Sequence, residues 1–541
     1  MANNSEQNAP FLPEGSKREK GRDAQRLNIL VAKAVANAVK STLGPKGMDK
    51  MLVDELGDVT ISNDGATILK EMAIEHPVGK MLVELAKTQD TEIGDGTTTA
   101  VVLAGELVGK AEALLDENIH PSIIIKGYKL AAEKALDYFK DISLPLTIKD
   151  KELLLDIART SMTGKAYDFN AQLANIVVDA VLKAYSINKE LDREDIKLEK
   201  KLGASILDTQ LINGIVLDKE IIHSEMPKLV KDAKIAILSS ALEIKEPETD
   251  AKIQISSPEQ LMSFVDQEEA LLKKMVDAIK ATGANVVLCQ KGIDDLAAHY
   301  LAKAKILAVR RLKESDISLL AKATGAKIVN RIKDISKDDL GSAKQVYEKK
   351  VAGDSMLFIE GTKEPGAVTI LLRGGSEQSL AEIERTINDA VCAVISSLKI
   401  GRYVAAGGSS EVEVALKLRD FARTIGGREQ LAIETFADVL DVIPKTLAES
   451  AGLDAIDTIV TLRSKHQSPE NKFVGIDVIN SKITDMKKLN VIEPLNIKTQ
   501  AIVSSIEVVE MILRIDDIIA ASSKNKGYGG MPPGGMPPMD M

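Results

Sequence analysis

Residues 91–100 read TEIGDGTTTA, and a long apolar run follows them. Two glycines flank Asp95, and Thr97, Thr98 and Thr99 come directly afterwards. A helix that begins here presents its first unpaired backbone N–H groups and its positive dipole end, which together favour a bound anion. A carboxylate would repel a phosphate unless a divalent cation lay between them, and Mg²⁺ is typically held by carboxylates and phosphate oxygens. The stretch therefore indicates either a simple helix cap or the phosphate and Mg²⁺ end of a nucleotide site.

The length and charge of the chain exclude several classes of protein. Its 541 residues suggest about three or four domains. With 70 basic and 80 acidic side chains the net charge is −10, so we expect neither a nucleic-acid partner nor an anionic membrane surface. The two cysteines, Cys289 and Cys392, have no zinc-site spacing. We expect no signal peptide and no membrane span, and hence a reduced, cytoplasmic protein.

The first part of the chain reads as helical. A helix from Arg22 is expected to stop at a Gly-Pro pair, Gly44 and Pro45. Residues 59–69 look like two short strands around an Asn-Asp-Gly turn. Helices continue to about residue 185, with an interruption at 160–165. That interruption is either an ordinary turn with a solvated lysine or a place where Lys165 senses a phosphate.

The centre of the chain is predicted to contain both short strands and helices, as in an α/β domain. A charged excursion from residue 241 leads to Ser257 and Pro258, which open a helix that is expected to run to Thr282. This element is either a surface helix or a protrusion whose apolar tip meets another chain. Short strands are expected at 215–217, 234–238, 285–288, 306–309 and 327–329.

The last third returns to helices. A long helix, 376–398, carries Asp389, which alone would be read as a solvated carboxylate. A second glycine pair, Gly407 and Gly408, opens the next helix. Further expectations are a hairpin at 473–484, a last helix over 498–521 and a disordered Gly-, Pro- and Met-rich tail.

The candidate phosphate-binding elements lie on both sides of the α/β block. If they form one site, the chain leaves a helical base, builds a distal α/β domain and returns. The sequence contains no P-loop, no kinase motif set and no dinucleotide fingerprint after a strand.

Five motifs in order then carry a resemblance. Residues 43–50 (LGPKGMDK), 63–67 (NDGAT), 94–99 (GDGTTT), 388–390 (NDA) and 406–408 (AGG) are similar to the nucleotide signatures of chaperonins, and the resemblance covers essentially the whole chain. The insertion after residue 241 and the Thr-Gly-Lys at 163–165 resemble group II chaperonins, the archaeal thermosome subunits in particular.

The resemblance implies a multidomain fold of α and α/β domains and an ATP-driven machine for protein folding. Copies of the chain, or paralogous subunits, would form two stacked rings of eight or nine that enclose unfolded client proteins under a built-in lid. The implied parts are a flexible arm (1–21), a helical equatorial domain (22–146 and 404–522), an intermediate domain (147–215 and 367–403), an apical α/β domain (216–366) with its protrusion at about 241–282, and the tail (523–541).

The resemblance also implies the residues of the site, which would bind ATP or ADP with Mg²⁺. Asp95 would bind the metal, and Asp389 would activate the attacking water with Asp64 as a second carboxylate. Lys165 would sense the γ-phosphate, and Gly408 and Glu493 would contact the ribose or base side. The remaining nucleotide contacts would be Leu43, Gly44, Pro45, Gly65, Gly94, Gly96, Thr97, Thr98, Thr99 and Gly407.

Two other functions compete with this interpretation. A metabolic ATP-dependent transferase would need a second constellation of catalytic side chains in the α/β block, where the sequence shows no His/Asp/Ser cluster and the five histidines are scattered. A non-hydrolysing scaffold would use nucleotide only for assembly, and Asp389 is the residue that distinguishes it from an ATPase.

Overall fold

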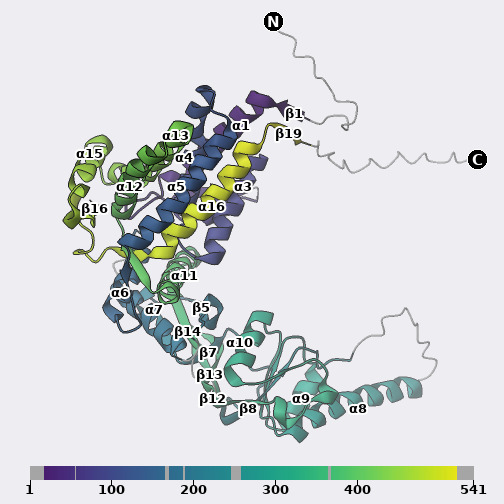
Figure 1. Cartoon of the computed structure of the whole chain (residues 1–541). Helices are drawn as coiled ribbons and strands as arrows, with labels where there is room; N and C mark the ends of the chain where they lie inside the picture. Colours follow the sequence, from purple (N-terminus) through teal and green to yellow (C-terminus); the bar gives the residue numbers. More distant parts are fainter. Residues whose placement is uncertain are drawn as a thin grey trace, which may run out of the picture.

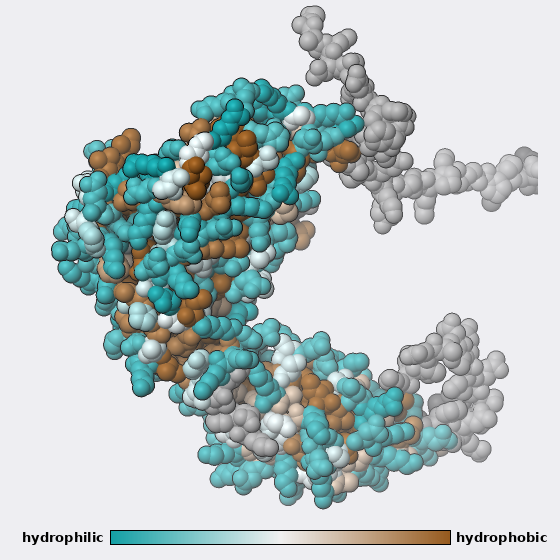
Figure 2. Space-filling view, in the orientation of Figure 1, coloured by the Kyte–Doolittle hydropathy of each residue, from teal (hydrophilic) through white to brown (hydrophobic). Residues whose placement is uncertain are grey.

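The computed structural model describes residues 17–54, 56–164, 170–186, 189–244, 258–362 and 367–520. These parts form a C-shaped molecule (Figure 1), and the space-filling view has the same outline (Figure 2). A body of long helices lies at one end, an α/β unit at the other, and a smaller unit joins them. None of the helices in the described ranges is long and apolar enough to cross a membrane.

The helical body is built from the two ends of the chain. Helices α1, α3, α4, α5, α12, α13 and α16 pack side by side around one buried cluster, and Figure 1 shows α16 lying along α4 and α5. Its elements are β1 (Lys17–Lys20), α1 (Gly21–Lys40), β2 (Lys50–Val53), β3 (Val59–Ser62), α2 (Gly65–Glu71), α3 (Pro77–Glu92), α4 (Thr97–Asp116), α5 (Pro121–Ile142), α12 (Ser409–Ile425), α13 (Gly427–Leu440), α14 (Val442–Ser450), α15 (Ala455–His466), β16 (Val474–Asp477), β17 (Lys482–Asp485), α16 (Leu495–Arg514) and β19 (Asp517–Ala520).

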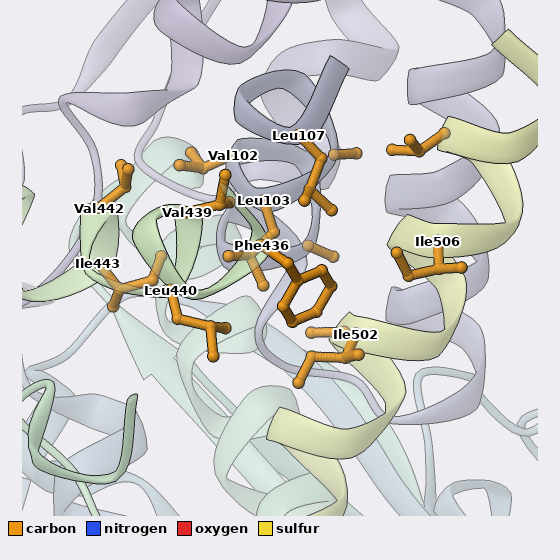
Figure 3. Close-up of a cluster of buried hydrophobic side chains, with 14 of the residues drawn as sticks. Val102, Leu103, Leu107, Phe436, Val439, Leu440, Val442, Ile443, Ile502 and Ile506 are labelled. Atoms are coloured by element: carbon orange, nitrogen blue, oxygen red, sulfur yellow. The ribbon is translucent and has the colours of Figure 1, made fainter. Parts of the chain in front are cut away.

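Phe436 lies near the centre of this core. It is 2% exposed and makes an edge-to-face contact with Tyr128, the two ring centroids being 6.2 Å apart. Figure 3 shows side chains from α4, α13, α14 and α16 converging on it, among them Leu107 and Ile502. The Tyr128 hydroxyl donates to the carbonyl of Leu107 at 3.1 Å, so the one polar atom of the pair is satisfied.

The two ends of the described chain are paired with each other. Strands β1 and β19 run antiparallel, and Arg18 forms an ion pair with Asp517. The expectation of a flexible arm up to residue 21 is therefore wrong for residues 17–20, and residues 1–16 lie outside the described ranges. The predicted last helix, 498–521, is also too long, because α16 begins at Leu495 and ends at Arg514 before β19.

A third expectation fails at residues 59–69. Strand β3 ends at Ser62, and Asp64 is the N-cap of the short helix α2. The Asp64 carboxylate accepts the backbone N–H and the hydroxyl of Thr67, both at 2.8 Å. An Asp followed by Gly can start either a turn or a helix, and here the capping bonds favour the helix.

The middle unit holds α6 (Lys151–Met162), α7 (Asn170–Tyr185) and α11 (Glu377–Ile400) on a small sheet. Strand β14 (Val368–Gly374) lies between β5 (Ile196–Leu202), which is parallel to it, and β6 (Gln210–Ile212), which is antiparallel. Strands β4 (Leu144–Pro145), β15 (Arg402–Ala405) and β18 (Ile492–Pro494) form the sheet that connects this unit to the helical body. The short 3₁₀ helices of the chain span Arg193–Asp195, Ile206–Asp208, Ile332–Asp334, Lys337–Asp339 and Pro469–Asn471.

The distal unit is a mixed sheet with helices on both faces. Its strand order is β10-β9-β8-β12-β13-β7, with β11 added beside β8. Helix α10 packs on one face and helices α8 and α9 on the other. The five expected strands are confirmed, and β12 and β13 are an additional hairpin. The elements are β7 (Gly214–Leu217), β8 (Leu229–Leu238), α8 (Pro258–Thr282), β9 (Val286–Cys289), α9 (Asp295–Lys303), β10 (Leu307–Val309), α10 (Glu314–Thr324), β11 (Ile328–Val329), β12 (Gly341–Val351) and β13 (Asp354–Thr362).

Replacement of Phe436 by alanine is expected to destabilise the helical body. The substitution removes a fully buried ring and leaves a cavity, which typically costs about 3–5 kcal/mol. Denaturant unfolding followed by far-UV circular dichroism measures the change. Leu431→Ala, on the same helix but 40% exposed, is the matched control and should shift the midpoint far less. Equal shifts for the two variants would contradict the central position of Phe436.

Candidate functional site

A cavity of about 300 Å³ lies between the helical body and the middle unit. Its walls come from α4, the loop before α12, α14, the β16–β17 hairpin and α16 of the body, and from α6 and α11 of the middle unit. Most of the residues that the sequence singled out meet here. Those lining it are Leu43, Gly44, Pro45, Asp64, Asp95, Gly96, Thr97, Thr98, Thr99, Asp389, Gly407, Gly408 and Glu493.

The N-terminus of α4 forms one wall. Its N-cap is Gly96, which has a φ of +77° and offers no side chain to cap the helix. The first intrahelical bond is donated by Ala100, so the N–H groups of Thr97, Thr98 and Thr99 precede it and belong to the cavity wall. These backbone donors, with the helix dipole behind them, can bind an anion. The structure therefore favours the anion site over a simple side-chain cap.

A second helix N-terminus meets the same cavity. Helix α12 begins after Gly408, whose φ is +76°, and it too has no side-chain cap. A Cβ at Gly408 would lie 2.6 Å from the Cβ of Pro444, and a Cβ at Gly407 would lie 2.6 Å from the Met486 sulfur. Glycine is therefore required at both positions by conformation and by space. Two uncapped helix N-termini suit a ligand with several negative charges.

Five carboxylates line this cavity, and three of them, Asp64, Asp95 and Asp389, are the predicted metal and catalytic groups. Asp64 accepts the hydroxyl of Thr97 at 3.0 Å, which ties α2 to the start of α4. Asp95 accepts the N–H of Gly96 at 2.7 Å and the hydroxyl of Ser161 at 3.0 Å. Carboxylate oxygens beside anion-binding groups are the donors that Mg²⁺ prefers, so these residues fit a Mg²⁺ ion that neutralises phosphate charge.

Two of the predicted glycines serve packing and are not on the cavity wall. A Cβ at Gly65 would lie 2.7 Å from the Thr98 hydroxyl, so this glycine lets α2 approach α4. Gly94 has a φ of +75°, and a Cβ there would overlap Cys392. Burial and the neighbouring Asp389 raise the pKa of the Cys392 thiol to about 12, so it is a packed, protonated contact.

The middle unit touches the body directly at this site. Gly164, with a φ of +94°, follows α6 and lies against the Gly44–Pro45 loop, where a Cβ would be 2.7 Å from the Cα of Pro45. Lys165 itself lies outside the described residues, so its expected role is not addressed by the structure. Ser161 lies in the stretch 160–165, for which the sequence predicts only an interruption between helices. In the structure it is on α6, and its hydroxyl donates a hydrogen bond to Asp95.

A buried ion cluster that the sequence analysis missed lies at the other end of the cavity. The Lys498 ammonium is 2.6 Å from Glu411 Oε1 and 2.8 Å from Glu493 Oε1. Burial raises the pKa of Glu493 to about 7, Lys498 opposes the shift, and the second carboxylate, Glu411, adds to it. The sequence carried no clear signal for this cluster, because Lys498 lies beside polar residues at the start of α16 and its partners are glutamates from two other segments.

This arrangement can support phosphoryl transfer to water. Such a reaction needs charge neutralisation and an aligned nucleophile more than covalent participation by the protein. The helix N-termini provide fixed donors, Asp95 and Asp64 can hold a metal, and Asp389 provides a carboxylate on a separate unit.

Known proteins are similar to this chain over nearly its whole length. A family model described as the TCP-1/cpn60 chaperonin family matches residues 35–523. Thermosome subunit alpha of Archaeoglobus fulgidus is 56% identical over 523 residues, which covers 96% of each chain. A thermosome subunit of Pyrococcus horikoshii is 56% identical over 530 residues, covering 97% of this chain and 96% of its own. Thermosome subunit beta of Thermococcus kodakarensis is 56% identical over 534 residues, covering 98% of both.

The partly buried carboxylate of Glu493 is expected to make stability depend on pH. A folded-state pKa near 7, raised from 4.5, means that folded protein retains a proton that unfolded protein releases. The contribution is therefore present below about pH 4.5 and lost as the pH rises through 7. In Glu493→Gln this loss is absent, so the stability of the variant relative to wild type should rise as the pH rises from 4.5 to 7.

Denaturant unfolding of nucleotide-free protein at a series of pH values measures this difference. Glu507→Gln, at an exposed position on helix α16, which follows the strand that carries Glu493, is the control for removal of one carboxylate. A difference between Glu493→Gln and wild type that stays constant from pH 4.5 to 7 would contradict the assignment.

Proposed function

The chain belongs to the TCP-1/cpn60 chaperonin family, and on that premise we propose that it is a subunit of an ATP-driven group II chaperonin. Its activity would be to enclose non-native proteins in a ring-shaped cavity and to release them after hydrolysis. The observation that carries the proposal is the composite cavity, in which two glycine-initiated helix N-termini face carboxylates from the body and the middle unit. Isolation of an unfolded chain prevents its aggregation during folding.

We assign the following roles within the site. The N–H groups of Thr97, Thr98 and Thr99 bind phosphate oxygens, and Asp95 holds Mg²⁺, which would neutralise the phosphates. Asp389 accepts the proton of the attacking water, with Asp64 close to the phosphate end. The loop at Gly44 and Pro45, together with Gly407, Gly408 and Glu493, surrounds the rest of ATP or ADP. Leu43 and Gly96 complete the wall, Gly65 and Gly94 permit close packing beside it, and Lys165 would sense the γ-phosphate.

Hydrolysis would be coupled to movement because the catalytic groups belong to two units. Asp389 lies on α11, while the phosphate-binding amides lie on α4. The Asp95–Ser161 hydrogen bond and the Gly164–Pro45 contact connect the same two units. A hydrogen bond from the attacking water to Asp389 would hold the middle unit closed on the body, and the distal unit would follow.

The division into domains follows the buried clusters. Separate apolar clusters in the body, the middle unit and the distal unit support a helical equatorial domain (22–146 and 404–522), an intermediate domain (147–215 and 367–403) and an apical domain (216–366). The protrusion at about 241–282 would form the lid, although residues 245–257 lie outside the described ranges.

The outer half of α8 supports the lid assignment. Its first described side chains are exposed, Met262 by 71% and Leu271 by 47%, and the first buried one is Leu272. Figure 1 shows α8 extending away from the distal unit. A helix that leaves its own domain with apolar residues exposed suits contact with neighbouring subunits or clients.

The assembly we propose is a pair of stacked rings of eight or nine subunits. The relatives include subunits designated alpha and beta in one organism, which supports rings made of paralogous chains as well as rings of identical copies. The non-hydrolysing scaffold and the metabolic transferase remain the competing functions, and the two experiments below separate them from an encapsulating ATPase.

Asp389→Asn is expected to retain ATP binding and ring assembly but to lose most hydrolysis. The amide keeps the size of the carboxylate and cannot accept the proton of water, a loss of at least about 100-fold in kcat. Phosphate release measures hydrolysis, and a fluorescent nucleotide measures binding. Glu377→Gln, exposed on the same helix, is the control and should hydrolyse at the wild-type rate. Wild-type turnover by Asp389→Asn would leave the scaffold interpretation in place.

Deletion of residues 245–270 is expected to leave ATPase activity intact and to abolish enclosure. The deletion stops before Leu272, the first buried residue among the described side chains of α8, so the described part of the core of the distal unit is kept. Protease digestion of a bound, unfolded client with and without ATP is the measurement. Protection of the client by the deletion variant after addition of ATP would rule out the lid assignment.

A further inference from the structure

Two histidines that are far apart in sequence meet on the distal unit. The rings of His223 and His299 have centroids 5.9 Å apart, although 75 residues separate them along the chain. Glu225 lies beside them, and one ligand atom from each of the three side chains lies within 4.8 Å of the others. The histidines that look scattered in sequence therefore include one pair, and it lies in a different unit from the nucleotide cavity.

We propose that His223, Glu225 and His299 form a binding site for a divalent transition-metal ion, with Zn²⁺ as the representative. Two imidazoles and one carboxylate match the nitrogen and oxygen donors that Zn²⁺ accepts. Mg²⁺ and Ca²⁺ prefer oxygen ligands alone, so the metal of the nucleotide cavity is of a different class. The proposal is independent of the function proposed above.

The backbone around the three side chains is well fixed. His299 belongs to α9, where its neighbours Ala298 and Leu301 are buried against the sheet. The loop that carries the other two is held by a 3.2 Å hydrogen bond from Ile222 N–H to the carbonyl of Ala308, and by the buried side chain of Met226. Rigid supports reduce the entropy lost when the ligands converge on a metal.

Only a small adjustment is needed for coordination. Ligand atoms about 2.0–2.2 Å from a tetrahedral Zn²⁺ lie about 3.3 Å from each other, so the present separations must contract by at most about 1.5 Å. Glu225 is exposed, and rotation of its side chain can supply most of this movement. His223 Nδ1 accepts a 3.2 Å hydrogen bond from the N–H of Glu225, and coordination replaces this single contact.

Three protein ligands leave further positions on the metal for water or a donor from another chain. The site connects the loop after β7 to α9, and α9 packs against α8. Tyr300, the residue after His299, also bonds to Glu269 of α8. A bound ion would therefore stiffen the base from which the exposed half of α8 extends.

Metal binding by the full-length chain, with Mg²⁺ in excess to occupy the carboxylates of the nucleotide cavity, tests the proposal. Titration of Zn²⁺ followed by calorimetry should give one site per subunit. His223→Ala and His299→Ala should each weaken it at least about tenfold. His120→Asn, which changes an exposed histidine of the helical body and keeps a side chain able to cap α5, should bind as wild type does.

Co²⁺ absorption provides an independent readout of the ligands. Wild type should show the intense visible bands of a four- or five-coordinate ion, and both histidine variants should lose them. Circular dichroism spectra and unfolding midpoints equal to those of wild type establish that each variant is folded. Equal Zn²⁺ affinity in wild type and both variants, or a Co²⁺ spectrum like that of the hydrated ion, would overturn the proposal.

Discussion

The site depends on two helices that begin at left-handed glycines and share one cavity. Gly96 and Gly408 have φ values of +77° and +76°, and neither offers a side chain to satisfy the first turn of its helix. The unpaired N–H groups are a cost to the unliganded protein. A polyanion relieves that cost at both helices at once, which is why elements about 300 residues apart in the chain must be held together by one core.

That core explains why the nucleotide cavity can act on distant parts of the molecule. The body is a single buried cluster of long helices, so its part of the cavity behaves as a fixed wall. The middle unit has its own cluster and touches the wall through small or polar groups, Ser161 and Gly164. Such contacts can form and break without exposing apolar surface. Separation of the residues within either core would expose it.

Much of this could be predicted from sequence because glycine and aspartate motifs carry local conformational demands. Gly44, Gly96 and Gly408 all have positive φ and all line the cavity. The errors arose where a motif has two local solutions, as at Asp64, or where packing decides, as at Gly94 against Cys392. The β12–β13 hairpin was missed although its strands meet across a two-residue turn at Ala352 and Gly353, because an alanine with positive φ is an unusual turn residue.

Buried charge was the least predictable feature, since its meaning depends on partners from distant segments. Lys498 alone would be a costly residue inside α16. With Glu411 and Glu493 it becomes one cation shared by two carboxylates, so one negative charge remains uncompensated at neutral pH unless a proton is bound. Hydrophobic residues of similar volume would often be as stable. Stability alone therefore does not explain this cluster at the wall of the cavity. A role in orienting Glu493 toward a ligand explains it better.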